Sequence, residues 1–361
     1  MADEEKPEWQ NHVKFLDLRE VWKIIGLTLP IITDEGKLNW SEDYRVNIAV
    51  VDSGVKKEHR AFTTTNTTTK VVSSKCLPLQ GEDNSISTIT DCDGHGTFCA
   101  GVAAGFNICS PNPVQVSSIL NALPRLSELL TSNVTCSLEQ NQEQNQELAE
   151  IIKELAGSPS KSLPYFVGVA PFAHIHSLKV YHDHNKTNIE KPVALALKEI
   201  LSHNTLHQDK KEKVHIVCIS LALHYNDELR QAMYEVLNND VIVVTAACNK
   251  GQTSDYCNGN IWFPARFGNT ISVGSHDILG RPSQFSSVGR EVDFLAPGEE
   301  IWGPSIKGMD DVIEKVFSFT KFDNFLMALI CVLETNQRLK AYHIPKNLLK
   351  KMLGKSLILE K

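Results

Sequence analysis

The sequence predicts an α/β protein of three layers, in which helices cover both faces of a mostly parallel β-sheet. Strand-like runs recur at residues 46–51, 173–180, 214–220 and 241–247, most of them largely apolar, and helical patterns lie between the later runs. Strands that are buried on both faces and alternate with helices form parallel sheets. The chain has 361 residues, 42% of them apolar, which is enough to bury a large core. Wholesale disorder and fibrous repeats are therefore excluded.

The first predicted strand covers residues 46–51 and ends at Asp52. Residues 1–43 before it mix charged side chains with Leu, Ile and Trp, and we interpret them as an N-terminal adapter segment. Residues 44–335 are predicted to form one domain. The length alone would allow two domains, but the elements described below belong to a single α/β pattern.

Residues 106–163 depart from this pattern. Ser, Asn and Gln dominate the segment, which includes the low-complexity run at residues 139–146. Such a composition is typical of a surface segment that adds little to a core. We therefore expect a polar insertion, with one amphipathic helix over residues 148–155.

The alternation of elements resumes with a strand at residues 173–180. Thr187, with Glu190 three residues later, has the pattern of a capping box at the start of a helix. The apolar positions of that helix fall on one face and are Val193, Leu197, Ile200 and Leu201. The remaining predicted elements are a strand at 214–220, a helix at 227–238, and strands at 241–247 and 270–274.

The end of the chain changes character. Residues from 322 onward have a broad apolar helical face, and residues 336–361 hold seven Lys or Arg against one Glu. We expect a basic helical tail at 336–361. Such a tail could contact an anionic surface, but a solvated helix face fits its modest length better.

Composition limits the partners. The 36 Lys and Arg against 43 Asp and Glu give a net charge of −7, which argues against nucleic-acid binding. No apolar stretch approaches the roughly 18 residues of a membrane span, and the first residues do not have the pattern of a secretion signal. We expect a cytoplasmic protein. The nine cysteines contain no C-x-x-C pair, so free buried thiols are expected rather than disulfides or a zinc site.

Two residues are candidates for acid–base chemistry. Asp52 follows a buried strand, at the end of the sheet where catalytic groups gather, although an Asp that only makes a turn fits equally well by itself. His95 stands between Gly94 and Gly96, before a run of small residues that suits a tightly packed helix. A carboxylate could fix the tautomer of this imidazole while the imidazole accepts a proton. This context favours a functional His over an incidental surface His.

These residues resemble a known family. Asp52-Ser53-Gly54-Val55 and Asp93-Gly94-His95-Gly96-Thr97 are similar to motifs of the subtilisin-like serine proteases, or subtilases. Further blocks agree in order, and they are Gly168-Val169-Ala170-Pro171, Ile219-Ser220-Leu221, Val241–Gly251 and Phe294-Leu295-Ala296-Pro297-Gly298. The resemblance extends from about residue 45 to residue 318, apart from the insertion.

The resemblance implies a subtilisin-like fold and a serine endopeptidase that acts on peptide or protein substrates. It assigns Asp52 and His95 to the catalytic set and the side-chain amide of Asn249 to the oxyanion hole, although by itself Asn249 could be a turn residue. It assigns Ser220, Leu221 and Ala222 to the strand that binds substrate. Ala222 replaces the usual Gly, so its methyl group is expected to crowd a bound peptide. Calcium is common in the family, but no acidic loop identifies a site, and we expect no metal or other cofactor.

The nucleophile of the family is absent. Its Gly-Thr-Ser-Met-Ala segment should follow the Ala-Pro-Gly block, but when Phe317-Ser318 is matched to the family's Phe-Ser, Lys321 falls at the place of the serine. Ser318 is three residues too early. The chain could be an active protease, an inactive peptide-binding or regulatory module, or an interaction protein that uses the insertion and the tail. It could also be a product that diverges from an active parent near Ser318.

Overall fold

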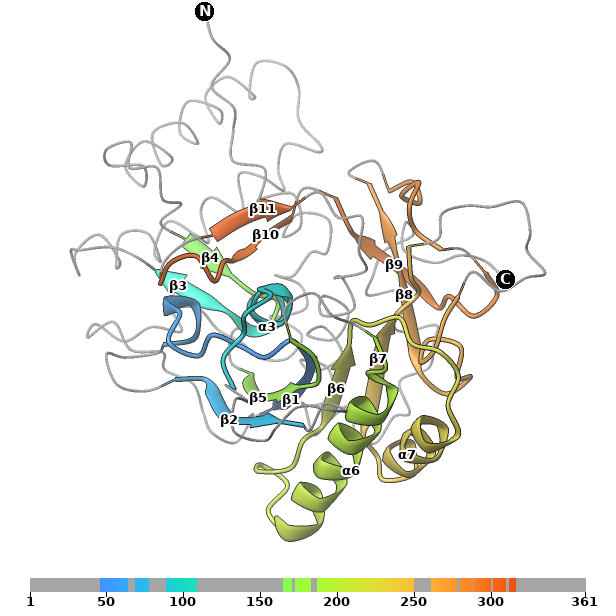
Figure 1. Ribbon diagram of the computed structural model, residues 1–361. Helices are drawn as coiled ribbons and strands as arrows, with labels where there is room; N and C mark the ends of the chain where they lie inside the picture. Colours follow the sequence, from blue (N-terminus) through green and yellow to red (C-terminus); the bar gives the residue numbers. More distant parts are fainter. Residues whose placement is uncertain are drawn as a thin grey trace, which may run out of the picture.

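A computed structural model of the chain describes eleven ranges of residues: 46–63, 69–77, 89–108, 165–170, 173–182, 187–249, 261–277, 280–287, 289–299, 301–309 and 312–315. Their main feature is a seven-stranded sheet with the order β2-β5-β1-β6-β7-β8-β9 (Figure 1). Its strands are β1 (Asn47–Asp52), β2 (Val71–Cys76), β5 (His174–Lys179), β6 (Ile216–Ile219), β7 (Ile242–Ala246), β8 (Ile271–His276) and β9 (Phe294–Pro297). Every neighbouring pair is parallel. The predicted parallel α/β class is confirmed.

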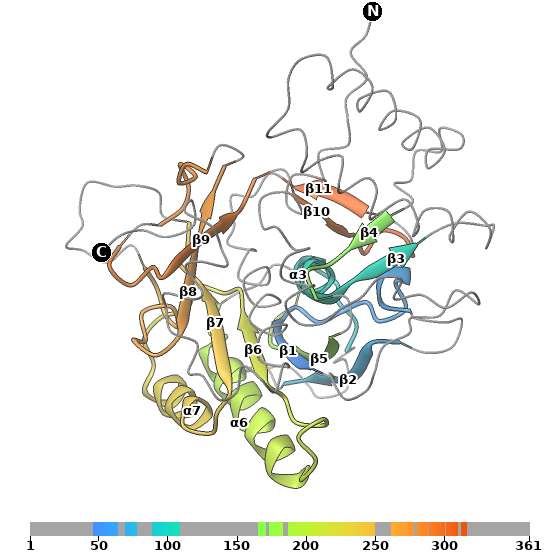
Figure 2. The ribbon, with the colours of Figure 1, turned by 180° about the vertical axis from the view of Figure 1, so that it is seen from behind.

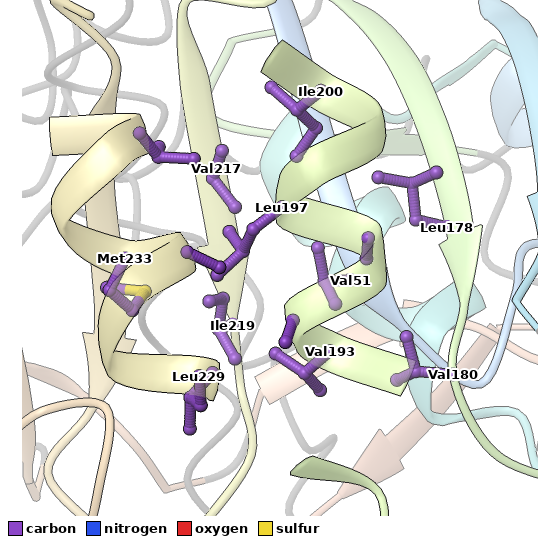
Figure 3. Close-up of a cluster of buried hydrophobic side chains, with 14 of the residues drawn as sticks. Val51, Leu178, Val180, Val193, Leu197, Ile200, Val217, Ile219, Leu229 and Met233 are labelled. Atoms are coloured by element: carbon purple, nitrogen blue, oxygen red, sulfur yellow. The ribbon is translucent and has the colours of Figure 1, made fainter. Parts of the chain in front are cut away.

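One face of the sheet is covered by α6 (Glu190–Leu206) and α7 (Asp227–Leu237). Figures 1 and 2 show the two helices side by side along β6 and β7. A single apolar core joins them to alternate residues of the strands (Figure 3). Its members include Val51, Leu178, Val193, Leu197, Ile200, Val217, Ile219, Leu229 and Met233. The predicted apolar face of the first of these helices is confirmed, with Leu201 partly buried against the core.

The predicted capping box at the start of α6 is wrong. The helix is capped by Ile189, and no side chain there accepts a backbone hydrogen bond. Asn188 has a left-handed φ of 56°, so the backbone turns between Thr187 and the helix and Thr187 cannot occupy the cap position. The carboxylate of Glu190 instead accepts a hydrogen bond from the backbone amide of His224 at 3.0 Å.

The opposite face is covered near β1 by α3 (His95–Ala104), whose ten residues are all buried. Ile48 and Val50 point to this face, because they alternate with the strand residues that face α6. The helix needs small residues for its close approach to neighbours. A Cβ on Gly101 would lie 2.2 Å from the Pro304 ring.

The described structure also contains a 3-10 helix, η2 (Arg60–Phe62), and two short antiparallel pairs, which Figure 2 shows near α3. One pairs β3 (Phe106–Ile108) with β4 (Tyr165–Val167), and the other pairs β10 (Ile301–Pro304) with β11 (Val312–Lys315). The first three residues of the predicted insertion thus belong to a paired strand. The rest of that insertion, the adapter at 1–43 and the tail at 336–361 lie outside the described residues. None of the described helices has the length and hydrophobicity that crossing a membrane requires.

Candidate active site

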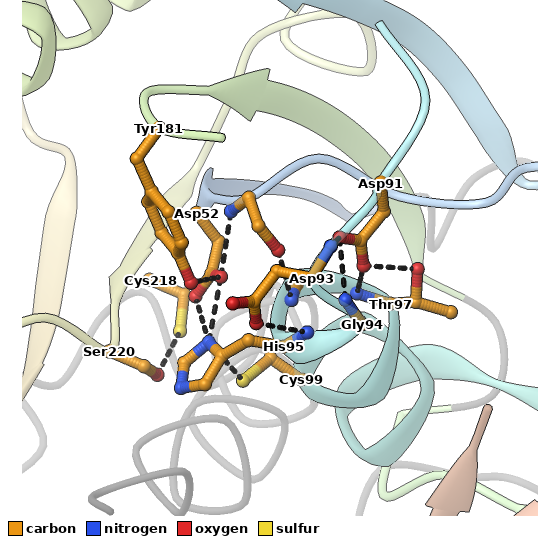
Figure 4. A network of polar contacts seen from close by, with 12 residues as sticks. Asp52, Asp91, Asp93, Gly94, His95, Thr97, Cys99, Tyr181, Cys218 and Ser220 are labelled. Atoms are coloured by element: carbon orange, nitrogen blue, oxygen red, sulfur yellow. Dashed lines mark hydrogen bonds and ion pairs between the residues drawn. The ribbon is translucent and has the colours of Figure 1, made fainter. Parts of the chain in front are cut away.

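Asp52 and His95 meet at the carboxyl end of β1. Asp52 is the last residue of that strand, and His95 is the first residue of α3. The imidazole Nδ1 lies 2.7 Å from each carboxylate oxygen of Asp52 (Figure 4). The two residues are only 1% and 3% exposed. A buried carboxylate in this position holds the proton on Nδ1 and leaves Nε2 as the nitrogen that can accept a proton.

Two further groups fix the Asp52 carboxylate. Its Oδ1 accepts hydrogen bonds from the backbone amide of Ser53 at 2.7 Å and from the hydroxyl of Tyr181 at 3.1 Å. Burial, and then the nearby charge of Asp52, raise the pKa of Tyr181 far above its usual range. The phenol therefore keeps its proton and acts as a donor. Tyr181 was not among the residues that the sequence indicated, because nothing in the local pattern links it to Asp52.

The loop before α3 is organised by a second buried carboxylate. One oxygen of Asp91 accepts from the amides of Asp93 (3.0 Å) and Gly94 (2.8 Å), and the other accepts from the amide and hydroxyl of Thr97 at 2.9 and 2.6 Å. Gly94 has a φ of 88°, which glycine adopts without strain. The Asp93 side chain accepts from the amide of His95 at 3.1 Å. The loop thus places His95 at the first position of the helix.

A direct contact joins this helix to the end of β1. The amide of Gly96 donates to the Ser53 hydroxyl at 2.9 Å. A Cβ on Gly96 would lie 2.2 Å from the carbonyl oxygen of Gly54 and 3.1 Å from the Asp52 Cβ. Only a residue without a side chain allows this approach, and the approach brings the imidazole to the carboxylate. The glycines around His95 that the sequence singled out serve this purpose.

Asn249 lies at the same edge of the sheet. It follows the end of β7, and β1 and β7 both pair with β6 in parallel, so their carboxyl ends share one edge. Cys248 before it has a left-handed φ of 84°, which turns the chain at this point. Both amide atoms of Asn249 are buried, and neither has a hydrogen-bond partner among the described residues. A buried amide without a partner is unfavourable unless a ligand completes it.

The predicted substrate-binding residues follow β6, between the ends of β1 and β7. Ser220 and Leu221 are buried, and Ala222 is exposed. The next residue, Leu223, donates its amide to the carbonyl of Phe263 at 2.8 Å, which fixes this segment. The structure thus leaves the Ala222 methyl group on an accessible edge. Lys321 and Ser318 lie outside the described residues.

These features define a class, which is a parallel α/β protein with a carboxylate–imidazole pair and a buried side-chain amide at one edge of its sheet. The profile of the subtilase family matches residues 44–321, and the chain belongs to that family.

Individual relatives match shorter stretches. The Major intracellular serine protease of Bacillus subtilis is 31% identical over 135 residues, which cover 37% of this chain and 39% of that protein. Subtilisin Savinase of Lederbergia lenta is 29% identical over 136 residues, 37% of this chain and 45% of that protein. These matches thus span less than half of the length of either relative. The solved structure of the Prenylagaramide maturation protease PagA shares the fold, with a TM-score of 0.50 and 16% identity over 90% of this chain and 82% of that one.

Proposed function

We propose that the chain is a subtilisin-like serine endopeptidase unit that retains the acid–base pair and the oxyanion donor but lacks the nucleophile, so that it binds peptides or proteins without hydrolysing them. The observation that supports this most is the buried contact of 2.7 Å between Asp52 and the Nδ1 of His95. The Asn249 amide, which has no partner among the described residues, supports it independently, because an oxyanion would supply an acceptor. Peptide binding at this site requires no cofactor.

The geometry supports a role for each of these residues. Asp52 holds the Nδ1 proton, so Nε2 of His95 would accept the proton of an attacking hydroxyl and later return it to the leaving amine. The amide of Asn249 would donate to the oxygen that becomes negative. Lys321 cannot replace the serine, because attack by an amine would end in a stable amide rather than a labile ester. Loss of the serine in subtilisin itself lowers kcat by about 10⁶.

A fluorophosphonate probe tests the missing nucleophile, because it labels serines that an adjacent base activates. We expect no labelled serine in the full chain. Lys321→Ser is expected to gain labelling that His95→Ala removes, whereas the matched control Lys321→Ala gains none. A serine of the unaltered chain that is labelled, and loses the label in His95→Ala, would overturn the proposal in favour of an active protease.

A binding measurement tests the second part of the proposal, that the chain binds peptides or proteins. The fluorescence anisotropy of fluorescein-labelled casein should rise when the unaltered chain is added. The casein should stay intact on a gel. Ala222→Gly should tighten binding several-fold, because the exposed methyl group lies where a peptide would run. If Ala222→Gly leaves the affinity unchanged and deletion of residues 109–163 abolishes binding, the proposal is wrong. The chain would then be an interaction protein that binds through its insertion.

We further propose that the chain works in the cytoplasm. The relative from Bacillus subtilis is named as intracellular, which supports this placement. Fractionation of cells that express the chain tests it, and recovery with the medium would contradict it.

A further inference from the structure

A third potential ligand lies beside the Asp52–His95 pair. Cys99 follows His95 by one helical turn on α3, and its Sγ lies 3.7 Å from the imidazole Nδ1 (Figure 4). One carboxylate oxygen, one imidazole nitrogen and one sulfur thus lie within 4.8 Å of one another. Cys99 is fully buried, and the other two residues are nearly so. The acid–base roles proposed above use Asp52 and both nitrogens of His95, but they give the sulfur no task.

We propose that Asp52, His95 and Cys99 form a binding site for one divalent cation of the zinc type, and that this cation switches the acid–base pair off. The metal-binding part of this proposal rests only on the geometry of the three side chains. The consequence for catalysis rests on the proposed function.

The distances suit a tetrahedral ion after a small adjustment. Zinc bonds of about 2.3 Å to sulfur and about 2.0–2.1 Å to nitrogen or oxygen place the sulfur about 3.5 Å from the nitrogen, and the oxygen about 3.3 Å from it. The sulfur is already at 3.7 Å, and the oxygen, now at 2.7 Å, would have to move away by about 0.6 Å. If Oδ2 is the ligand, the bonds from Ser53 and Tyr181 to Oδ1 can remain. Water would occupy the fourth position.

The charges also balance. A carboxylate, a thiolate and a neutral imidazole carry two negative charges, which a divalent ion neutralises in a buried site. Binding releases one proton, from the thiol, while the imidazole stays neutral because its proton moves from Nδ1 to Nε2. The mixture of sulfur, nitrogen and oxygen selects zinc or cadmium over calcium and magnesium, which bind oxygen ligands.

Coordination would stop the base by moving its proton. When Nδ1 of a neutral imidazole binds a metal, the ring proton sits on Nε2. That nitrogen is then a donor and cannot accept a proton from a nucleophile. The metal therefore blocks acid–base chemistry without blocking the entry of a peptide.

Cadmium titration tests the site, because a thiolate–cadmium bond absorbs in the ultraviolet and needs no enzymatic activity. We expect one equivalent to produce this band in the full chain. Cys99→Ala should abolish it, Asp52→Asn should weaken binding at least tenfold, and the matched thiol control Cys76→Ala should leave it unchanged. Alanine suits a buried helical position, and Cys99→Ser serves as a second variant of nearly native volume. A band that persists in both Cys99 variants overturns the proposal.

A cluster of histidines could compete for zinc, so its contribution must be distinguished from that of the proposed site. The rings of His176, His203 and His207 lie next to one another, with centroids 4.9 Å apart in an edge-to-face pair and 4.2 Å apart in a tilted pair, and His207 contacts Glu212 at 2.6 Å. Such imidazoles also attract zinc. A zinc-dependent rise in melting temperature should survive in the double variant His203→Gln, His207→Gln and disappear in Cys99→Ala. The reverse result overturns the proposal.

The Lys321→Ser variant separates this inference from the proposed function. Zinc should suppress its fluorophosphonate labelling, EDTA should restore it, and Cys99→Ala should make it insensitive to zinc. Cadmium binding without any labelling would contradict the proposed function alone. Labelling without cadmium binding would contradict the metal site alone.

Discussion

At the end of β1, the carboxylates of Asp52 and Asp91 each accept several hydrogen bonds, whereas the amide of Asn249 at the end of β7 has no partner among the described residues. The carboxylate of Asp91 accepts four hydrogen bonds, and Asp52 accepts from an amide, a phenol and the imidazole. Both amide atoms of Asn249 are buried, and among the described residues neither has a partner. The two regions lie on one edge of the same sheet, but they differ in whether their buried polar groups have hydrogen-bond partners among the described residues.

The difference separates stability from function. Paired buried groups stabilise the folded chain, and removing one of them leaves its partners unsatisfied. An unpaired buried group weakens the folded chain, and a ligand that supplies its partner can explain why it is kept. Substitutions near β1 should therefore change the free energy of unfolding most, and substitution of Asn249 should change it least and with the opposite sign.

Asp91→Ala should lower the free energy of unfolding by about 5 kcal/mol, because it leaves four donors, three of them buried, without an acceptor. Urea denaturation measures this loss. The free energy of unfolding of Asp91→Asn should lie between those of Asp91→Ala and the unaltered chain, because its single amide oxygen can accept only some of the four hydrogen bonds. Glu58→Ala, at an exposed carboxylate, should change stability by less than about 0.5 kcal/mol. Equal effects of Asp91→Ala and Glu58→Ala would show that the loop does not depend on Asp91.

Lys70 should make stability depend on pH. Its ammonium group is buried at the end of α3, where it donates to the carbonyl of Ala104 at 2.9 Å, and burial lowers its pKa to about 7. Above pH 7 the folded chain loses this proton, while the unfolded chain keeps it until about pH 10.4. The unfolded state then binds more protons, so the free energy of unfolding rises with pH, by about 4 kcal/mol between pH 7 and 10.

Lys70→Met removes the titrating group and serves as the comparison. Its free energy of unfolding should lack this rise and should exceed that of the unaltered chain at pH 6, where the unaltered chain buries a charge. Urea denaturation across pH 6 to 10 gives both curves. Parallel curves for the two proteins would contradict the assignment.

Gly96→Ala should lower the free energy of unfolding by about 3 kcal/mol, since its Cβ would lie 2.2 Å from the Gly54 carbonyl oxygen. The matched control is Gly268→Ala, where a Cβ has nothing within 4 Å, and it should change stability by less than about 0.5 kcal/mol. Thermal unfolding compares the two. In the Lys321→Ser background, Gly96→Ala should also reduce fluorophosphonate labelling, because it separates His95 from Asp52.

The positions of the site residues could be predicted from the sequence, but the hydrogen bonds that hold these residues in place could not. Asp52 follows an apolar run at the edge of the sheet where catalytic groups gather, and the resemblance to the subtilases added Asn249 to the same site. The partners of Asp52 and the bonds of Asp91 depend on contacts that no local pattern records. Tyr181 is 129 residues from Asp52 in the chain, and only the folded sheet brings its hydroxyl there.

The same limit explains the elements that sequence analysis missed. β2 has a mixed pattern with only one fully buried residue, so its pairing with β5 decides its conformation. The β3–β4 and β10–β11 pairs are short and depend on partners distant in the chain or joined by an irregular loop. The capping box failed because a single left-handed residue, Asn188, overrides a correct spacing.

Asn249→Leu should raise the free energy of unfolding by about 1 kcal/mol, because leucine has a similar volume and no buried amide to leave unpaired. In the Lys321→Ser background, the same substitution should slow reaction with the probe. Loss of one oxyanion donor in subtilisin lowers kcat by about 10²–10³, and we expect a large effect in that direction. A gain in stability together with a loss of reactivity is the signature of a group kept for its ligand.

Asn47→Leu is the matched control, because the amide of this buried residue donates to the carbonyls of Lys211 and Lys213 at 2.8 and 2.9 Å. Here leucine leaves two carbonyls without donors, so the free energy of unfolding should fall by about 2 kcal/mol. Urea denaturation of the two variants side by side gives opposite signs if Asn249 is unpaired in the free protein. If Asn249→Leu destabilises the chain as much as Asn47→Leu does, the amide is already satisfied within the fold. An oxyanion would then have to displace an existing partner, and the contrast between the two ends of the site would disappear.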